Sequence, residues 1–180
     1  MRIKPLVVLG VLAVALSACT SSPQPTASPS DLKPSVTASP SDSASIGDAS
    51  AYTVTGAWGK KPVVAIAAGA GNVSNLIVKD IIPGTGAAVQ ATDNVTVNYV
   101  GIGALSRKQF DASWDSGSTA SFPLSGVILG WQQGLIGMKV GGRRLLVIPG
   151  DLAYGATPPA GSGIKANESL IFVVDLVSIP

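Results

Sequence analysis

Trp131 is the residue of this sequence whose surroundings first suggest a binding site. It stands in the stretch VILGWQQGL, residues 127–135, between Gly130 and Gly134. Small neighbours leave space beside a large indole, so the side chain is either an ordinary core residue or the floor of a pocket that accepts an apolar group. Its place on an apolar helical stripe favours the core position, and this pattern alone leaves both interpretations open.

The composition excludes the commonest catalytic groups. The chain of 180 residues has no histidine, so it contains no Ser-His-Asp triad, no Cys-His pair and no histidine metal ligand. Its 12 basic and 10 acidic residues become equal in number once Arg2 and Lys4 are set aside, and no basic surface for nucleic acid is expected. Cys19 is the only cysteine, which leaves no partner for an intramolecular disulfide.

The first residues have the pattern of an export signal. A basic start precedes an apolar run at residues 6–16, shorter than the ~20 residues of a membrane-spanning helix. Residues 16–19, LSAC, resemble a bacterial lipobox, in which the cysteine is lipid-modified and becomes the first residue of the mature protein. We therefore expect a lipoprotein signal peptide at residues 1–18 and lipidation at Cys19. The alternative is an ordinary cleaved signal with a chance cysteine.

The rest of the chain divides into a linker and one folded part. Residues 19–50 are mostly Ser, Thr, Pro and Ala, which offer too little apolar surface to offset the entropy of ordering. They predict a disordered tether. The remainder has the length of one domain, and we divide it into an N-terminal strand extension at residues 51–75 and a main domain at residues 76–180.

The elements that must position Trp131 are mostly strands. Alternating or β-branched apolar runs predict strands at residues 52–55, 63–66, 76–82, 95–99, 145–148 and 170–177. Only one helix is clear, from Trp131 to Met138, and a helix so short must be held against a sheet. The predicted fold class is α+β: an antiparallel β-sheet wrapped around one short α-helix, with an added N-terminal strand or hairpin. Gly130 is expected to turn the chain into the helix, and Arg143 and Arg144 to form a solvated strand end.

Five motifs follow one another in an order that is typical of one family. They are VNYVG at 97–101, FDAS at 110–113, VILGWQQGL at 127–135, GGRRLLVIPGDLAYG at 141–155 and SLIFVVDLVSI at 169–179. In order and spacing they resemble the FKBP-type peptidyl-prolyl cis-trans isomerases, the family that binds the macrolides tacrolimus and rapamycin. The resemblance covers residues 76–180. It implies an FKBP-like fold and isomerase activity on X–Pro bonds, with no metal and no cofactor.

The resemblance also implies a set of site residues. The catalytic pocket would be lined by Tyr99, Phe110, Asp111, Val127, Ile128, Trp131, Tyr154 and Phe172, with Phe122 and Ile164 binding substrate beside them. Trp131 would be the floor under the proline ring, and Ile164 would lie on a flap above it. The backbone N–H of Ile128 and the hydroxyl of Tyr154 would donate to carbonyls of the bound chain. Two alternatives stay open: Asp111 as a loop cap, and Tyr154 as an aromatic packed on a strand end.

The sequence departs from the family at Ser116, where arginine is common, and at Ala120, where an aromatic is common. The flap at residues 157–163 is one residue longer than usual. The expected partners are proline-containing polypeptides, macrolides as inhibitors and a membrane reached through the lipid anchor; nucleic acid is not expected. We expect a monomer on the outer face of the cytoplasmic membrane that assists the folding of exported proteins. The alternative function is a proline-segment-binding chaperone or scaffold lipoprotein with little or no turnover.

Overall fold

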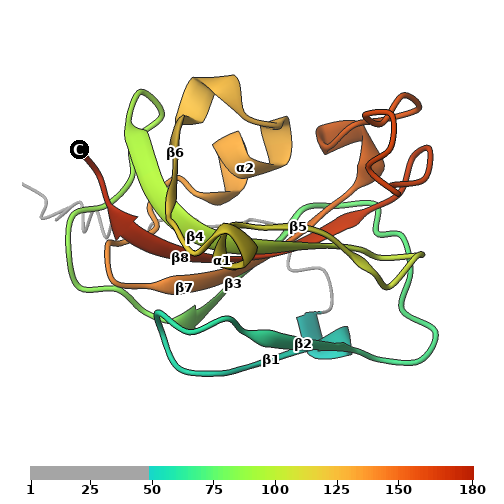
Figure 1. Ribbon diagram of the computed structural model, residues 1–180, viewed down its shortest axis with the longest axis horizontal. Helices are drawn as coiled ribbons and strands as arrows, with labels where there is room; N and C mark the ends of the chain where they lie inside the picture. The colour runs from blue at the N-terminus through green and yellow to red at the C-terminus, as the bar shows by residue number, and fades with distance from the viewer. Residues whose placement is uncertain (1–48) are drawn as a thin grey trace, which may run out of the picture. The chain divides into compact units, whose positions relative to one another are not determined.

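The computed structural model describes residues 49–180, so the predicted signal peptide, Cys19 and most of the predicted tether lie outside the described residues. The last two tether residues, Ala49 and Ser50, belong to a 3-10 helix, η1 (Ala49–Ala51). The strands are β1 (Tyr52–Thr55), β2 (Val63–Ile66), β3 (Ile77–Ile82), β4 (Asn94–Gly103), β5 (Gln109–Ala112), β6 (Ala120–Pro123), β7 (Arg143–Ile148) and β8 (Leu170–Ser178) (Figure 1).

Short helices connect several of these strands. They are α1 (Ser113–Ser116), η2 (Leu124–Gly126), α2 (Leu129–Gly134) and η3 (Gly150–Leu152). Within residues 49–180 no helix has the length and apolar character needed to cross a membrane. The predicted α+β class, an antiparallel sheet packed on a short helix, is confirmed.

Six strands form one antiparallel sheet with the order β3-β7-β8-β4-β5, and β6 also pairs with β4. One half of β4 pairs with β6 and the other half with β5, so these two short strands lie along the same edge of β4. β8 lies at the centre between β7 and β4, and its residues from Leu170 to Leu176 are all buried. A continuous apolar run is typical of a strand that is covered on both faces.

The two faces of the sheet carry two separate apolar clusters, because successive side chains of a strand point to opposite sides. On β7, Leu146 and Ile148 belong to the cluster that includes Trp131 of α2. Their neighbours Leu145 and Val147 belong to a second cluster, which includes residues of β1 and β2. The sheet is therefore covered by α2 on one face and by the β1–β2 hairpin on the other (Figure 1).

Two glycines bring α2 close to β7. A Cβ atom on Gly130 would lie 2.2 Å from Cγ2 of Ile148, and one on Gly134 would lie 2.7 Å from Cδ2 of Leu146. A side chain fits at either position only if the facing side chain of β7 or the backbone shifts. Gly130 lies within the helix and its φ is not positive, so it permits close packing and does not serve as the predicted turn into the helix.

The helix differs from its predicted bounds. It spans Leu129–Gly134 instead of residues 131–138, and Leu135 is already its C-cap. Leu135 and Met138 are nevertheless fully buried, as the apolar spacing indicated. The helix does not continue to Met138 because Gly137 has a φ of 74°, a left-handed conformation that ends a right-handed helix.

β1 and β2 form the added N-terminal hairpin, which we define as residues 52–66. Its strands pair in antiparallel register from Tyr52↔Ile66 to Thr55↔Val63. Tyr52 is buried in the second cluster, and Val54, Val64 and Ile66 pack against it partly buried. The hairpin therefore forms a second layer on the sheet, because its apolar face and that of the sheet bury each other.

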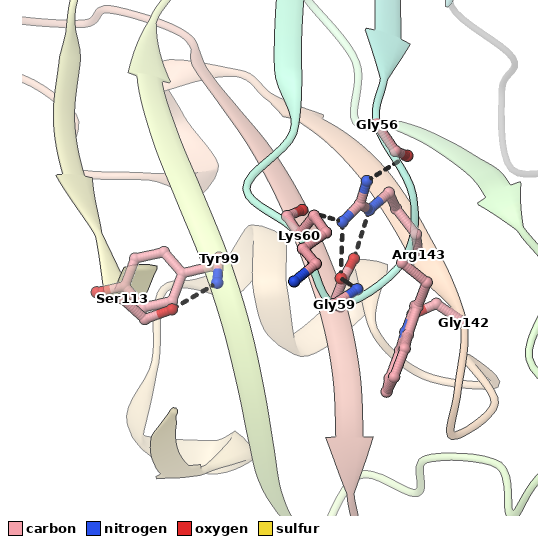
Figure 2. Close-up of polar contacts among 9 residues, drawn as sticks. Gly56, Gly59, Lys60, Tyr99, Ser113, Gly142 and Arg143 are labelled. Carbon is pink, nitrogen blue, oxygen red and sulfur yellow. Dashed lines mark hydrogen bonds and ion pairs between the residues drawn. The ribbon is translucent and has the colours of Figure 1, made fainter. Parts of the chain in front are cut away.

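Arg143 is buried between the sheet and the hairpin, and the predicted solvated strand end is wrong at this position. Its Nε and a terminal nitrogen bind both oxygens of Asp175 at 2.5 and 2.7 Å, and both side chains are 0% exposed. The hairpin completes the hydrogen bonding of this pair (Figure 2). The carbonyls of Gly56 and Lys60 accept from Arg143 at 2.8 and 2.7 Å, and the N–H of Gly59 donates to Asp175 at 2.7 Å.

Arg144 is also buried, on the opposite face of β7, so the prediction of a solvated strand end fails here too. Its guanidinium binds both oxygens of Asp80 at 2.6 and 3.0 Å. It also donates to the carbonyls of Gly134 and Ile136 at 2.8 and 3.2 Å. These carbonyls lie at and just after the C-terminal end of α2, where a helix has no intrahelical donors to offer. Arg144 therefore fastens the end of the helix to the sheet.

Candidate active site

A cavity of about 320 Å³ opens on the face of the sheet that carries α2. It is lined by Tyr99, Phe110, Asp111, Phe122, Gly126, Val127, Ile128, Trp131, Tyr154 and Phe172. The sequence predicted all of these except Gly126 as site residues. They come from β4, β5, β6, η2, α2 and β8 and from the loops that follow η2 and η3. A concave, mostly aromatic site of this size suits a small apolar group.

The floor of the cavity is Trp131, around which three aromatic rings stand nearly perpendicular. The ring centroids of Phe172, Tyr99 and Phe122 lie 5.3, 5.5 and 6.0 Å from that of Trp131, at interplanar angles of 86°, 86° and 90°. Edge-to-face contacts of this kind are favourable. Trp131 is 4% exposed and belongs to the main core cluster, yet it lines the cavity. Trp131 thus packs in the core and also lines the cavity, so the two positions that the sequence offered as alternatives do not exclude each other.

The indole N–H of Trp131 is buried and has no hydrogen-bond partner among the described residues. Leaving a buried donor unpaired costs free energy, so native proteins rarely do it without a functional reason. At the floor of a cavity the unpaired group indicates a surface arranged for a ligand more than for stability.

Gly101 makes room for two of the aromatic walls. It follows Tyr99 by two residues on β4 and therefore lies on the same face of the sheet. A Cβ atom there would lie 2.6 Å from Cζ of Phe110 and 2.9 Å from Cε1 of Phe172. The two rings meet above it with their centroids 5.6 Å apart. The glycine of the motif VNYVG is thus part of the site, although its side chain contributes nothing to the lining.

Asp111 is the only charged residue in the part of the cavity lining that the structure describes. It lies in β5, not in a loop, so the alternative of a loop cap is wrong. Its Oδ2 accepts a hydrogen bond from the hydroxyl of Tyr99 at 2.5 Å. Burial, then this hydrogen bond and the charge of Asp111, raise the pKa of Tyr99, and burial followed by the same charge raises the pKa of Tyr154. Both phenols are therefore protonated donors at neutral pH.

Two donors of the cavity wall are available to a ligand. Ile128 is the N-cap of α2, and its carbonyl accepts from Trp131 and Gln132, whereas its N–H has no partner within residues 49–180. The hydroxyl of Tyr154 likewise has no hydrogen bond to any described residue, and the side chain is 36% exposed. Gln132, which the sequence did not single out, donates to the carbonyl of Val127 at 2.8 Å and so fixes the loop between them.

Ile164 is the one predicted contact residue that does not line the cavity; it is half-buried and packs against the main core cluster. The base of its flap is held by Glu168, which is 2% exposed. Glu168 accepts from the N–H of Lys165 at 2.7 Å and, with its other oxygen, from those of Leu105 and Ser106 at 2.9 and 2.7 Å. Burial alone raises the pKa of Glu168, but these backbone donors outweigh it and lower the pKa, so the carboxylate is charged.

The two positions at which single residues depart from the family pattern have local structural contacts. The hydroxyl of Ser116 donates to the carbonyl of Ser113 at 2.8 Å, and Ala120 pairs with Val97 in the sheet. Neither residue lines the cavity. In the described part of the chain no three His, Cys, Asp or Glu side chains are grouped so that they could hold a metal ion.

Curated relatives share most of this domain. The family model described as FKBP-type peptidyl-prolyl cis-trans isomerase matches residues 86–177. A "Probable FK506-binding protein" of Corynebacterium glutamicum is 49% identical over 105 residues, which are 58% of this chain and 86% of that protein. An "FK506-binding protein" of Streptomyces anulatus is 48% identical over 108 residues, which are 59% of this chain and 87% of that protein.

Solved structures show the same fold. The crystal structure of FkpA from Escherichia coli is 40% identical and has a TM-score of 0.53, covering 62% of this chain and 52% of that chain. A peptidyl-prolyl cis-trans isomerase from Pseudomonas syringae is 33% identical, with a TM-score of 0.54, and covers 60% of this chain and 77% of that chain. The match of the family model includes every residue that lines the cavity. The chain therefore belongs to the FKBP-type peptidyl-prolyl cis-trans isomerases.

Proposed function

We propose that the aromatic cavity is the place where the X–Pro bond of a bound polypeptide rotates, and that macrolides such as tacrolimus and rapamycin inhibit the enzyme there. The observation that carries this proposal is the convergence of nine predicted residues, from separate parts of the chain, on one cavity with Trp131 at its floor.

The reaction needs a site that favours a twisted amide. Rotation about a peptide bond faces a barrier of ~18–20 kcal/mol because resonance keeps the amide planar. The cis and trans forms of X–Pro differ by only about 0.5–1 kcal/mol, so both occur and exchange slowly. The twisted transition state has lost the charge separation of the amide, and its carbonyl is less polar. An apolar cavity destabilises the planar form more than the twisted one, which is selective binding of the transition state.

Each group of the cavity has a part in this mechanism. The proline ring rests on the indole of Trp131, within the perpendicular rings that surround it. The free N–H of Ile128 and the hydroxyl of Tyr154 donate to carbonyls of the substrate and hold the chain on either side of the rotating bond. Asp111 keeps the hydroxyl of Tyr99 oriented. No step transfers a proton, which agrees with a chain that has no histidine.

The decisive experiment is a protease-free isomerisation assay on the full chain, with and without tacrolimus. We expect turnover of a proline tetrapeptide that tacrolimus inhibits to saturation. Tacrolimus binding without turnover would favour the alternative, a chaperone or scaffold that holds proline segments. Turnover that tacrolimus does not affect would place catalysis outside this cavity.

Gly101 offers a test of the cavity walls. Gly101→Ala is expected to weaken tacrolimus binding about tenfold, because overpacking forces the rings of Phe110 and Phe172 to move. Gly71→Ala is the matched control, since a Cβ atom there meets only Cδ2 of Leu105, at 3.6 Å. Calorimetric titration measures both affinities. Equal affinities in the two variants would contradict the assigned wall.

The location of the enzyme is a separate proposal. We infer that lipid attached at Cys19 holds the chain on the outer face of the cytoplasmic membrane, where it assists the folding of exported proteins. The support is in the sequence: LSAC ends a short signal-like apolar run, and Cys19 is the only thiol. Residues 19–48, rich in Ser, Thr and Pro, then give the domain reach from the membrane.

Cys19→Ser tests the anchor. The variant is expected to appear in the aqueous phase of a detergent partition, whereas the wild-type chain enters the detergent phase with its lipid. Labelling with a radioactive fatty acid provides the direct control, because only the wild-type chain should incorporate it. Identical partition of both chains and no label in either would contradict lipid attachment.

A further inference from the structure

We infer that the N-terminal hairpin positions the strand that carries Phe110 and Asp111, and thereby sets part of the geometry of the active site. The hairpin lies on the face of the sheet opposite α2 (Figure 1), and the family model matches only the chain that follows it. It acts through Lys61 and Arg107, neither of which lines the cavity. We therefore assign these two as positioning residues.

β5 needs support of this kind, because it is an edge strand. Among the described strands it pairs only with β4, through Val100↔Ala112, Gly101↔Asp111 and Ile102↔Gln109, and the register shifts between Gly101 and Ile102. A short edge strand with an irregular ladder opens more readily than a central strand. A catalytic constellation, in contrast, must be held to within about 0.5 Å. Contacts from outside the sheet can hold β5 in place more firmly than its pairing with β4 does alone.

The first such contact follows β5. Lys61, at the turn of the hairpin, forms an ion pair with Oδ1 of Asp115 in α1. The other oxygen of Asp115 accepts from the side-chain amide of Gln109, the first residue of β5, at 2.6 Å. Asp115 thus connects the hairpin to the beginning of β5, and through the chain to its end. The ion pair is exposed, so salt screens it.

The second contact precedes β5. Arg107 lies in the loop from β4 and has a φ of 54°. Its guanidinium donates to three carbonyls at and after the end of β2: Ile66 at 3.2 Å, Ala67 at 2.9 Å and Ala70 at 3.2 Å. The planar fork of an arginine suits several acceptors at once, which a lysine cannot match. The hairpin and the segment that directly follows it, up to Ala70, therefore hold the chain on both sides of the four residues of β5.

The hairpin is itself firmly fixed, which makes it a useful support. Its turn binds the buried pair of Arg143 and Asp175 through Gly56, Gly59 and Lys60 (Figure 2). The indole of Trp58 in the same turn donates to the carbonyl of Gly142 at 3.1 Å. Lys61 comes directly after this anchored turn. The backbone of Lys61 is therefore held in place by contacts with the centre of the sheet.

The experiment compares variants of the full chain that differ only in these contacts. Lys61→Met and Arg107→Met remove the polar head and keep an apolar stem. Lys60→Met and Lys108→Met are matched controls, because each is an exposed neighbour whose side chain has no partner within the described residues. Two kinds of measurement are made: the kinetics on a proline tetrapeptide, as kcat and KM, and amide hydrogen exchange in β5 and in β8.

We expect Lys61→Met and Arg107→Met together to lower kcat/KM about three- to tenfold, mainly through kcat, because a displaced wall costs orientation more than contact area. Exchange should accelerate in β5 and stay unchanged in β8. Unchanged kinetics and unchanged β5 exchange would overturn the inference. So would equally faster exchange in β8, which would mean general destabilisation.

This inference rests on the proposed site, but the two fail separately. If the cavity is not the site, tacrolimus binding survives substitution of Trp131, whatever the hairpin variants do. If the hairpin does not position β5, the Lys61 and Arg107 variants match their controls, Lys60 and Lys108, while Trp131→Leu still weakens tacrolimus binding. The exchange measurement does not depend on activity at all.

Discussion

The Trp131→Leu chain is expected to fold and yet to bind tacrolimus roughly tenfold to a hundredfold more weakly, the range typical of a buried aromatic anchor. Leucine keeps an apolar side chain under the cavity but removes the flat surface on which the proline-like ring rests. It also removes the ring that Tyr99, Phe122 and Phe172 surround. The expected loss of stability is smaller than the ~3–5 kcal/mol of a change to alanine.

Fluorescence distinguishes a Trp131 that contacts the ligand at the floor of the cavity from a Trp131 that is only a core residue. With Trp58 and Trp114 both replaced by Phe, the remaining emission comes from Trp131, which should respond to saturating tacrolimus because the indole lines the cavity. Circular dichroism and a cooperative melting curve serve as controls for folding. A folded Trp131→Leu chain with wild-type affinity would sink the assignment. Trp131 fluorescence that stays unchanged at saturating tacrolimus would also contradict the assignment.

Asp175→Asn is expected to cost about 3–5 kcal/mol of unfolding free energy, because it leaves the guanidinium of Arg143 buried without a counter-charge. Both side chains are 0% exposed, so water cannot replace the lost partner. Domains of this size have only about 5–15 kcal/mol of net stability, and the variant should be close to unfolding. Urea titration at neutral pH, followed by tryptophan fluorescence, measures the change.

Asp80→Asn is the matched control on the same sheet. Asp80 also pairs with a buried arginine, Arg144, but its own side chain is 45% exposed. Water reaches this pair, and the expected cost is at most about 1 kcal/mol. A cost at Asp175 no larger than that at Asp80 would contradict the view that the hairpin seals the inner pair from solvent.

The structure confirms the strands that the sequence predicted, from the short ones at residues 52–55 and 63–66 to the longer apolar runs at 95–99 and 170–177. β5 and β6 were not predicted. Their sequences, QFDA and ASFP, are too short and too polar to show a period. They are strands because the long β4 offers each of them a partner, which is tertiary context that local pattern does not contain. The four-residue helix α1 was missed for the same reason.

The cavity could be predicted because its aromatic residues fall in motifs with a fixed order and spacing. The buried ion pairs could not be predicted. Charged residues are expected at the surface, and the sequence does not show which opposite charge will lie beside a given arginine. Arg143 depends on Gly56 and Lys60, more than eighty residues earlier in the chain. The same contacts show that the hairpin and the sheet share one core, although the sequence divided them into an extension at 51–75 and a domain at 76–180.

The two adjacent arginines also fix the alignment of the strands. In the sheet Arg143 lies directly opposite Asp175 of β8, and Arg144 lies directly opposite Asp80 of β3. The residues that follow on β7, Leu145 to Ile148, are apolar on both faces, so a slip by one residue would still bury apolar side chains on each side. The same slip would separate both ion pairs at once. Four charges therefore specify a register for three strands that hydrophobic burial by itself leaves nearly degenerate.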